Sequence, residues 1–202
     1  MARSTVGFRG LLVTIAVLGF VPNAISSLEP PRPRPAEPVA NPIAMLVRAL
    51  SQCGGELSER ERWRIAGAIH QESQRHGYDS LFILAMVEVE STCSPRARSH
   101  DGAVGLIQVK PSVARAVAEE AGLRWRGART LFQPAFNLHI GVRYLAQLER
   151  RYRDPRIAVA AYNLGPKRVA RMSRAQARQV RYVRKVLATY EDLLARHGKG
   201  RS

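Results

Sequence analysis

The strongest constraint on the fold is a helical pattern, divided by helix-ending residues, that runs from residue 43 to residue 196. Ser58 followed by Glu61 forms a capping box that opens one helix, and Gly77 closes it. No stretch alternates polar and apolar residues as a half-buried strand does. We expect helices over residues 43–52, 58–76, 81–91, 111–122, 134–152, 155–163 and 173–196. The buried stripe of the last one is predicted to be Val180, Val183, Val186, Leu187 and Tyr190. The sequence therefore predicts a mainly α-helical domain.

The first 26 residues have the pattern of an export signal. Arg3 and Arg9 give a basic start, the segment from Leu11 to Val21 is apolar, and Pro22 breaks that run. The run is shorter than the roughly 20 residues that a membrane-spanning helix needs. We therefore expect a signal peptide over residues 1–26 that is cleaved, in preference to a retained membrane anchor, and a protein located in the periplasm.

The export signal is followed by a proline-rich segment, residues 27–42. Such a composition favours an extended, stiff linker over a helix or a central strand. We expect one folded domain over residues 43–196 and a short loose tail over residues 197–202.

The chain is strongly basic, with a formal net charge of +16. Hydrophobic residues make up 46% of the sequence, so disorder is not the expectation for the chain as a whole. The charge suits a polyanionic partner, such as nucleic acid, an anionic membrane or the acidic polymers of a bacterial envelope. The basic residues run from Arg3 to Arg201, and we interpret them as a mostly solvated surface. Because they are not clustered and the chain is expected to be exported, we do not expect nucleic acid as a partner.

The chain has two cysteines, Cys53 and Cys93. In an oxidising compartment they are expected to form a disulfide, which closes a loop of about forty residues; two unpaired, buried cysteines are the alternative. Two cysteines cannot build a zinc centre alone, and the five histidines show no paired spacing. The sequence predicts neither a metal site nor a cofactor.

Glu90 ends an apolar stripe on the helix expected over residues 81–91. At about 100° per residue it lies within roughly 60° of Ile83, Met86 and Val87, whereas Glu88 faces about 160° away. Burial raises the pKa of a carboxyl group, which lets it hold a proton near neutral pH as a general acid must. On position alone, however, a glutamate that points outward from a helix end is the simpler interpretation.

Three blocks of residues add to this picture. Residues Glu90 to Pro111 read E-S, then A-x-S-x-x-G-A-x-G-L-I-Q and a proline; Asn137 to Leu148 read N-x-x-x-G-x-x-Y-L-x-x-L; Ala160 to Pro166 read A-A-Y-N-L-G-P. In this order they resemble the soluble lytic transglycosylases of the lysozyme-like superfamily. Ile107 stands where that family has methionine and Cys93 where it commonly has an aromatic residue. No acidic residue precedes Tyr182-Val183, where the family often has one.

The resemblance implies a goose-type, lysozyme-like helical domain with a catalytic cleft. Glu90 would be the catalytic residue, acting first as acid and then as base on the bond between N-acetylmuramic acid and N-acetylglucosamine. The product would be a 1,6-anhydromuramoyl end. Ser99 and Gln108 match positions that line the sugar site, and Tyr162 and Asn163 match a pair beside the glutamate, where a tyrosine hydroxyl could orient the acid.

The same resemblance leaves two alternatives open: a hydrolysing muramidase on this fold, and a weakly catalytic wall-binding component of a secretion apparatus. The partners it implies are the glycan strands of peptidoglycan and, for small members of the family, a secretion, pilus or flagellar assembly. We expect a monomer.

Gln71-Glu72-Ser73 looks like a second catalytic motif. No glycine-rich loop follows it at the right distance, so we interpret Glu72 as an ordinary surface glutamate.

Overall fold

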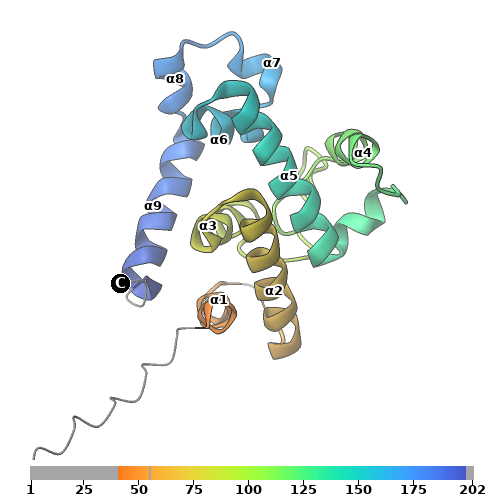
Figure 1. Ribbon diagram of the computed structural model, residues 1–202, viewed down its shortest axis with the longest axis vertical. Helices are drawn as coiled ribbons and strands as arrows, with labels where there is room; N and C mark the ends of the chain where they lie inside the picture. The colour runs from red at the N-terminus through yellow and green to blue at the C-terminus, as the bar shows by residue number, and fades with distance from the viewer. Residues whose placement is uncertain (1–40, 55, 199–202) are drawn as a thin grey trace, which may run out of the picture. The chain divides into compact units, whose positions relative to one another are not determined.

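The computed structural model describes residues 41–54 and 56–198 (Figure 1). The expected export signal, nearly all of the proline-rich linker and the last four residues of the tail lie outside these ranges. The helices are α1 (Pro42–Ser51), α2 (Glu59–His76), α3 (Ser80–Ser91), α4 (Pro111–Glu120), the 3-10 helix η1 (Ala128–Phe132), α5 (Pro134–Tyr152), α6 (Pro155–Leu164), α7 (Pro166–Val169), α8 (Arg174–Arg178) and α9 (Arg181–His197). Extended pairing in the described ranges is limited to two isolated bridges between loop residues. The mainly helical expectation is confirmed.

Local sequence signals explain where these helices begin. The capping box at Ser58 is present, with the Ser58 side chain accepting from the Glu61 N–H and Glu61 accepting from the Ser58 N–H. Asp79 caps α3 by accepting from the Leu81 N–H at 2.8 Å. Proline occupies the first turn of α1, α4, α5 and α6, where its missing N–H would have no helical partner. The first six expected helices are therefore found within two residues of their predicted ends.

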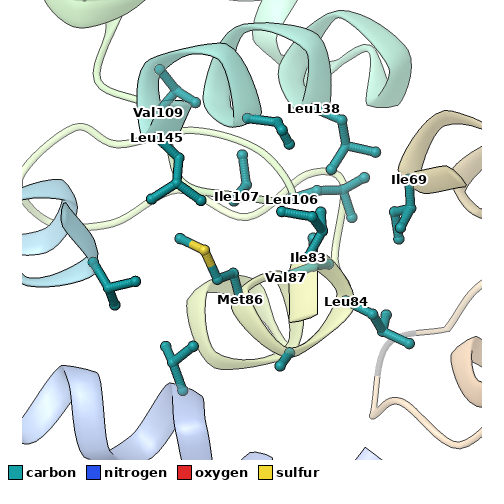
Figure 2. Close-up of a cluster of buried hydrophobic side chains, with 14 of the residues drawn as sticks. Ile69, Ile83, Leu84, Met86, Val87, Leu106, Ile107, Val109, Leu138 and Leu145 are labelled. Carbon is teal, nitrogen blue, oxygen red and sulfur yellow. The ribbon is translucent and has the colours of Figure 1, made fainter. Parts of the chain in front are cut away.

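The centre of the domain is α3, which is buried on nearly all sides. Ile83, Met86 and Val87 have no exposed surface. Figure 2 shows them pointing toward Ile107 in the loop that follows α3 and toward Leu138 on α5. The other faces of α3 pack against α1, α2 and α9. A helix packed on so many sides is a rigid support for Glu90, which lies one residue before its end.

The prediction of one last helix over residues 173–196 is wrong in one respect: this segment forms two helices, α8 and α9. Ser173 caps α8 through a second capping box, and α8 ends at Arg178. Val180 is extended, with ψ of 135°, before α9 begins. The break lets Arg178 Nε donate to Asp154 at 2.7 Å, which ties α8 to the start of α6. The predicted stripe is confirmed, because its five residues are buried or pack against the core.

The interpretation of Glu72 as a surface residue is also wrong. Glu72 is 4% exposed and lies between α2 and α5, where its Oε1 is 3.0 Å from His139 Nδ1. Ile65 and Ile69 precede it at helical spacing and are fully buried, so Glu72 belongs to the same face of α2. Glu72 is therefore part of the packing between α2 and α5.

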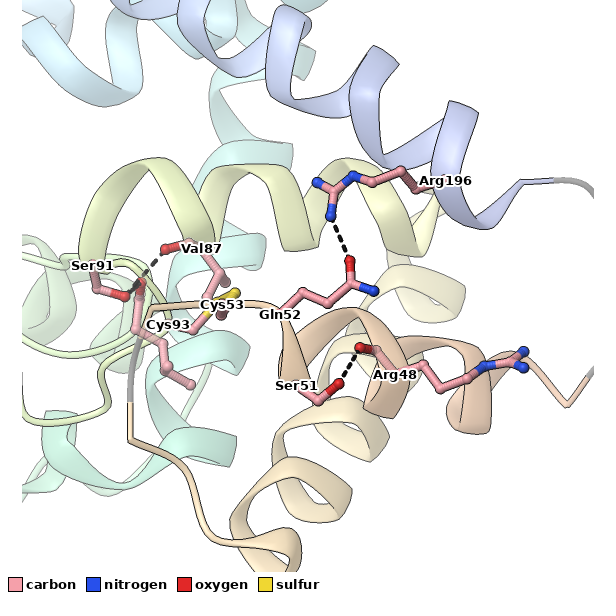
Figure 3. Close-up of a disulfide and its surroundings, with 9 residues drawn as sticks. Arg48, Ser51, Gln52, Cys53, Val87, Ser91, Cys93 and Arg196 are labelled. Carbon is pink, nitrogen blue, oxygen red and sulfur yellow. Dashed lines mark hydrogen bonds between the residues drawn. A yellow bond between two sulfur atoms is a disulfide. The ribbon is translucent and has the colours of Figure 1, made fainter.

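Cys53 and Cys93 form the expected disulfide, with their Cα atoms 6.0 Å apart. Figure 3 shows the bond joining the chain just after α1 to the segment that leaves α3. Close by, Arg196 of α9 donates to the side chain of Gln52 at 2.6 Å. The N-terminal helix is thus attached both to the end of α3 and to the end of α9.

None of the described helices is long and apolar enough to cross a membrane.

Candidate active site

Glu90 lies one residue before the end of α3, where the helix is joined to the loop that follows it. The Ser91 hydroxyl donates to Val87 O at 3.1 Å and to Leu106 O at 2.7 Å. The next two residues, Thr92 and Cys93, both have positive φ, 51° and 62°, so the chain turns sharply away from the helix. Such a conformation is unusual outside glycine and needs support, which the disulfide at Cys93 supplies.

The loop from Ala97 to Lys110 is held by α5. The buried side chain of Asn137 accepts from the Ile107 N–H at 2.9 Å and donates to Val104 O at 2.8 Å. Gly105 has φ of 83°, and a Cβ there would lie 2.4 Å from both Asn137 Nδ2 and Leu131 O. Glycine is therefore required at 105 by backbone conformation and by space.

A second glycine on α5 lets the loop come close. A Cβ at Gly141 would lie 2.2 Å from Ile107 Cγ2 and 2.9 Å from Tyr162 Oη. Tyr162 itself donates to Ile107 O at 2.8 Å, and its ring lies 5.5 Å from that of Tyr144. The loop is thus clamped between α5 and α6 at the residue just before Gln108.

These elements enclose a cleft of about 330 Å³. Its lining residues are Glu90, Ser99, Asp101, Ala103, Gln108, Val109, Lys110, Val113, Tyr144, Tyr162, Asn163, Leu164, Gly165 and Pro166. All five residues singled out from the sequence are among them, although they come from α3, the loop and α6. Sequence reasoning did not single out Tyr144, which belonged to a matched block, or Lys110 and Asp101, which gave no signal.

Two of the cleft residues also maintain the loop. Gln108 has φ of 47°, and its Nε2 donates to Ala97 O and to Gly105 O, so its amide nitrogen is engaged and its oxygen remains available to a ligand. Ser99 Oγ accepts from the Ala103 N–H at 3.0 Å, which leaves its own hydroxyl hydrogen to be donated. Asn163 is exposed at the α6 end of the cleft. Polar groups of both hydrogen-bonding kinds therefore face the cavity.

Glu90 is held by a tyrosine from the far end of the chain. The Tyr182 hydroxyl, on α9, donates to Glu90 Oε1 at 2.5 Å. Burial raises the pKa of Glu90 to about 7, an effect that the hydrogen bond from Tyr182 and the charge of Lys185 partly offset. The Tyr162 hydroxyl, which was expected to orient the acid, donates to Ile107 O, and Tyr182 is the tyrosine that donates to the acid; an orienting role of Tyr162 stays a prediction. The Tyr182-Val183 pair in the family pattern was the signal for Tyr182.

The arrangement suits proton transfer to a neutral ligand. A partly buried carboxyl with a pKa of about 7 is protonated in a large fraction of molecules at neutral pH. Asp101 also lines the cleft, but its side chain is well exposed and lies beside His100. Within the described ranges, no group of three histidine, cysteine or acidic residues could hold a metal ion.

A comparison with protein families decides the relationship. The model of the "Transglycosylase SLT domain" matches residues 67–184, which is more than half of the chain. The chain belongs to the transglycosylase SLT domain family. The match includes every residue that lines the cleft.

Relatives within this family agree. The chain is 32% identical over 157 residues to membrane-bound lytic murein transglycosylase C from Klebsiella pneumoniae, covering 71% of this chain and 44% of the relative. It is 38% identical over 109 residues to membrane-bound lytic murein transglycosylase F from Desulfosudis oleivorans, covering 50% of this chain and 22% of the relative. The chain spans less than half the length of these curated relatives.

Solved structures show the same fold. An inactive glutamate-to-glutamine mutant of lytic transglycosylase Slt from Pseudomonas aeruginosa superposes with a TM-score of 0.57 and 27% identity, covering 74% of this chain and 27% of that one. The 70 kDa soluble lytic transglycosylase from Escherichia coli superposes with a TM-score of 0.58 and 24% identity, covering 65% of this chain and 24% of that one. The expected lysozyme-like helical domain is confirmed.

Proposed function

We propose that this SLT domain cleaves the glycan strands of peptidoglycan as a lytic transglycosylase. The observation that carries the proposal is Glu90 itself: a carboxyl with a pKa of about 7, bonded to Tyr182, in a cleft with sugar-sized volume and polar walls. Two relatives of this chain are named lytic murein transglycosylases, and the inactive mutant that superposes on it has glutamine in place of a glutamate.

The proposed reaction uses one carboxyl group twice. Protonated Glu90 donates its proton to the oxygen that joins N-acetylmuramic acid to N-acetylglucosamine, and the bond from the muramoyl C1 to that oxygen breaks. The muramoyl 6-hydroxyl then forms a bond to C1 and releases its proton to the Glu90 carboxylate. Atoms balance without water, and Glu90 ends protonated as it began. The substrate supplies the nucleophile, so the reaction departs from the two-carboxylate scheme of most glycosidases.

The neighbours of Glu90 suit the two halves of this cycle. The hydrogen bond from Tyr182 stabilises the carboxylate that exists between the two proton transfers, while burial favours the protonated form before and after. Ser99, Gln108 and Asn163 are positioned to bind hydroxyl and N-acetyl groups of the sugars.

Asp101 supports a second candidate, because it places another carboxylate on the cleft wall. If it acted as a base on water, the same site would be a hydrolysing muramidase. The exposure of Asp101 argues against that role, since nothing in the described ranges holds its side chain toward Glu90.

Digestion of purified peptidoglycan tests the proposal. Wild type, Glu90→Gln and the control Glu88→Gln are incubated with intact walls, and the products are identified by mass. We expect anhydromuramoyl ends, one water molecule lighter than reducing ends, from wild type and Glu88→Gln and none from Glu90→Gln. Reducing ends alone would establish the muramidase, and an inactive wild type would favour a non-catalytic, wall-binding role.

We further propose, from the N-terminal sequence, that the chain is exported to the periplasm and, from the family resemblance, that it acts there as a monomer that opens the wall locally for a secretion, pilus or flagellar assembly. The N-terminal residue of the mature protein in a periplasmic fraction tests the first part. A mature chain that still begins at Met1 would contradict cleavage.

A further inference from the structure

The basic residues are concentrated in one part of the chain, contrary to the expectation of an even spread. Residues 150–190 contain twelve of the 32 arginine and lysine residues and one of the 16 acidic residues, a net charge of +11 out of +16. These residues form the end of α5, all of α6, α7 and α8, and the first part of α9. We call this region the basic lobe. Its helices lie together in Figure 1, where α6 is in contact with α7, α8 and α9.

The single acidic residue of the basic lobe adds little negative charge to the surface of the lobe. Asp154 is 7% exposed and is paired with Arg178 and Arg174, whose nearest nitrogens lie at 2.6 and 3.2 Å. All twelve basic side chains of the lobe are exposed. Apart from the two that pair with Asp154, none forms an ion pair with a carboxylate in the described ranges. The exposed cations are therefore available to an external anion.

The basic lobe adjoins the candidate active site. The residues from Asn163 to Pro166 form one wall of the cleft, and the chain continues directly into Lys167 and Arg168, both exposed. On the lobe's other side, Lys185 is near enough to Glu90 to lower its pKa. Lys110 stands on the rim of the cleft formed by the loop. A polymer lying in the cleft would pass over cations on leaving it.

The chemistry of the basic lobe favours carboxylates. Ten of its twelve cations are arginines, whose planar guanidinium binds a carboxylate through two parallel hydrogen bonds. The sugar backbone of peptidoglycan is uncharged, because its amino groups are acetylated and its lactyl groups are joined to peptide. The free carboxylates of the polymer belong to the peptide stems that project from it.

We propose that the basic lobe binds the free carboxylates of peptide stems on the strand held in the cleft, so that the enzyme selects stem-bearing glycan over bare glycan. The inference rests on the proposed function, because it takes peptidoglycan to be the substrate. It adds that substrate selection is electrostatic and comes from α7–α9, outside the cleft that holds the sugars.

Binding and cleavage are measured on three substrates made from one wall preparation: intact soluble strands, strands whose stem carboxylates have been chemically amidated, and strands stripped of their stems by an amidase, whose newly freed lactyl carboxylates are then amidated as well. The test variant is Arg168→Glu/Arg171→Glu. The matched control is Arg60→Glu/Arg64→Glu, which reverses two exposed arginines on α2. Circular dichroism and thermal unfolding establish that both variants fold.

For wild type we expect KM to rise about tenfold from intact to amidated strands, with kcat little changed, and the preference for intact strands to fade as salt is added. Amidated and stripped strands should behave alike, because the basic lobe recognises only the charge of the stem carboxylates. Arg168→Glu/Arg171→Glu should raise KM on intact strands about tenfold and leave stripped strands unaffected, whereas the α2 control should behave as wild type.

Equal KM values of wild type on all three substrates would overturn the proposal, as would equal effects of the two double variants. A lobe variant that keeps its preference for intact strands but no longer binds vesicles of anionic phospholipid would instead assign the basic lobe to a membrane. Binding of the three substrates to Glu90→Gln separates this test from the proposed function, because the preference can be measured even if wild type cleaves nothing.

Discussion

The hydroxyl of Tyr182 donates a hydrogen bond to the carboxyl group of Glu90 at 2.5 Å, across 92 residues of sequence and between α9 and α3. The contact joins the last long helix to the central one at the wall of the cleft. Packing of α9 on α3 therefore does more than bury apolar surface: it also determines how far the acid is desolvated and which hydrogen-bond partner it meets.

The first prediction concerns the pH dependence of cleavage. Because Glu90 must be protonated to act as the acid, kcat/KM should fall as the pH rises through about 7. The Tyr182 hydrogen bond lowers the pKa of Glu90, so Tyr182→Phe should move this fall to higher pH. Loss of a hydrogen bond to a charged group should also reduce kcat by about 10- to 100-fold. A pH–rate profile of both proteins measures the two effects.

Tyr190→Phe is the matched control for this prediction. Tyr190 lies on the same helix and donates to Asp79 at 2.8 Å, away from the cleft. Its removal is expected to lower the melting temperature and leave the pH profile in place. A profile of Tyr182→Phe that coincides with that of wild type would contradict the positioning role of Tyr182.

The second prediction is that Glu90 destabilises the fold at neutral and alkaline pH. Its pKa is about 7 in the folded chain, against an ordinary value of 4.5. A carboxyl with a raised pKa contributes most to stability below its unfolded pKa, and that contribution is lost as the pH rises through its folded pKa. Above pH 7 the loss is on the order of 3 kcal/mol.

Glu90→Gln cannot ionise, so it should be more stable than wild type by up to this amount at about pH 8, and by little near pH 4. Urea denaturation at both pH values measures the difference. Glu88→Gln, which removes a negative charge from another face of α3, is the control. If Glu90→Gln were no more stable than wild type at alkaline pH, Glu90 would not be desolvated as described.

The third prediction concerns the disulfide. Removal of a crosslink that closes a loop of 40 residues should cost about 4 kcal/mol by loop-closure entropy. The double variant Cys53→Ala/Cys93→Ala should therefore unfold at a lower urea concentration. The disulfide also supports the positive φ of Thr92 and Cys93, which follow Glu90. We therefore expect kcat to fall as well, even where the variant is fully folded. Stability that drops while kcat stays constant would limit the disulfide to a structural role.

Much of this fold could be predicted from helix-end signals, because capping acts between neighbouring residues. Ser58 and Asp79 cap as expected. The break between α8 and α9 was missed because local signals do not reveal the distant partner of α8: Arg178, the last residue of α8, donates to Asp154 at 2.7 Å. Glu72 was misjudged as a surface residue because no glycine-rich loop follows it, although its spacing from Ile65 and Ile69 placed it on the buried face.

The candidate site was predictable where the chemistry lies in a contiguous motif and less so where it depends on packing. Glu90, Ser99 and Gln108 were found from one block. The orienting tyrosine was assigned to Tyr162 because Tyr162 lies in a recognisable motif. The structure shows that the Tyr162 hydroxyl is used by Ile107 O, and that α9 brings Tyr182 to the acid instead. Only the packing of α9 on α3 distinguishes the two hydroxyls.

The last prediction tests the close approach of the cleft loop to α5. Gly141→Ala places a methyl group 2.2 Å from Ile107 Cγ2 and 2.9 Å from the Tyr162 hydroxyl, so the loop must move. We expect a loss of about 1–3 kcal/mol in the free energy of unfolding and a fall in kcat, because Gln108 follows the displaced residue.

Gly67→Ala is the matched control, since Gly67 lies within α2 and a Cβ there meets nothing within 4 Å. Alanine is the better helix former, so this variant should gain up to about 1 kcal/mol and keep full activity. The two substitutions are chemically identical and both lie in helices, so their opposite effects would isolate the contact with the loop. Equal stability changes would mean that the loop can yield without cost, and that Gly141 does not set its position.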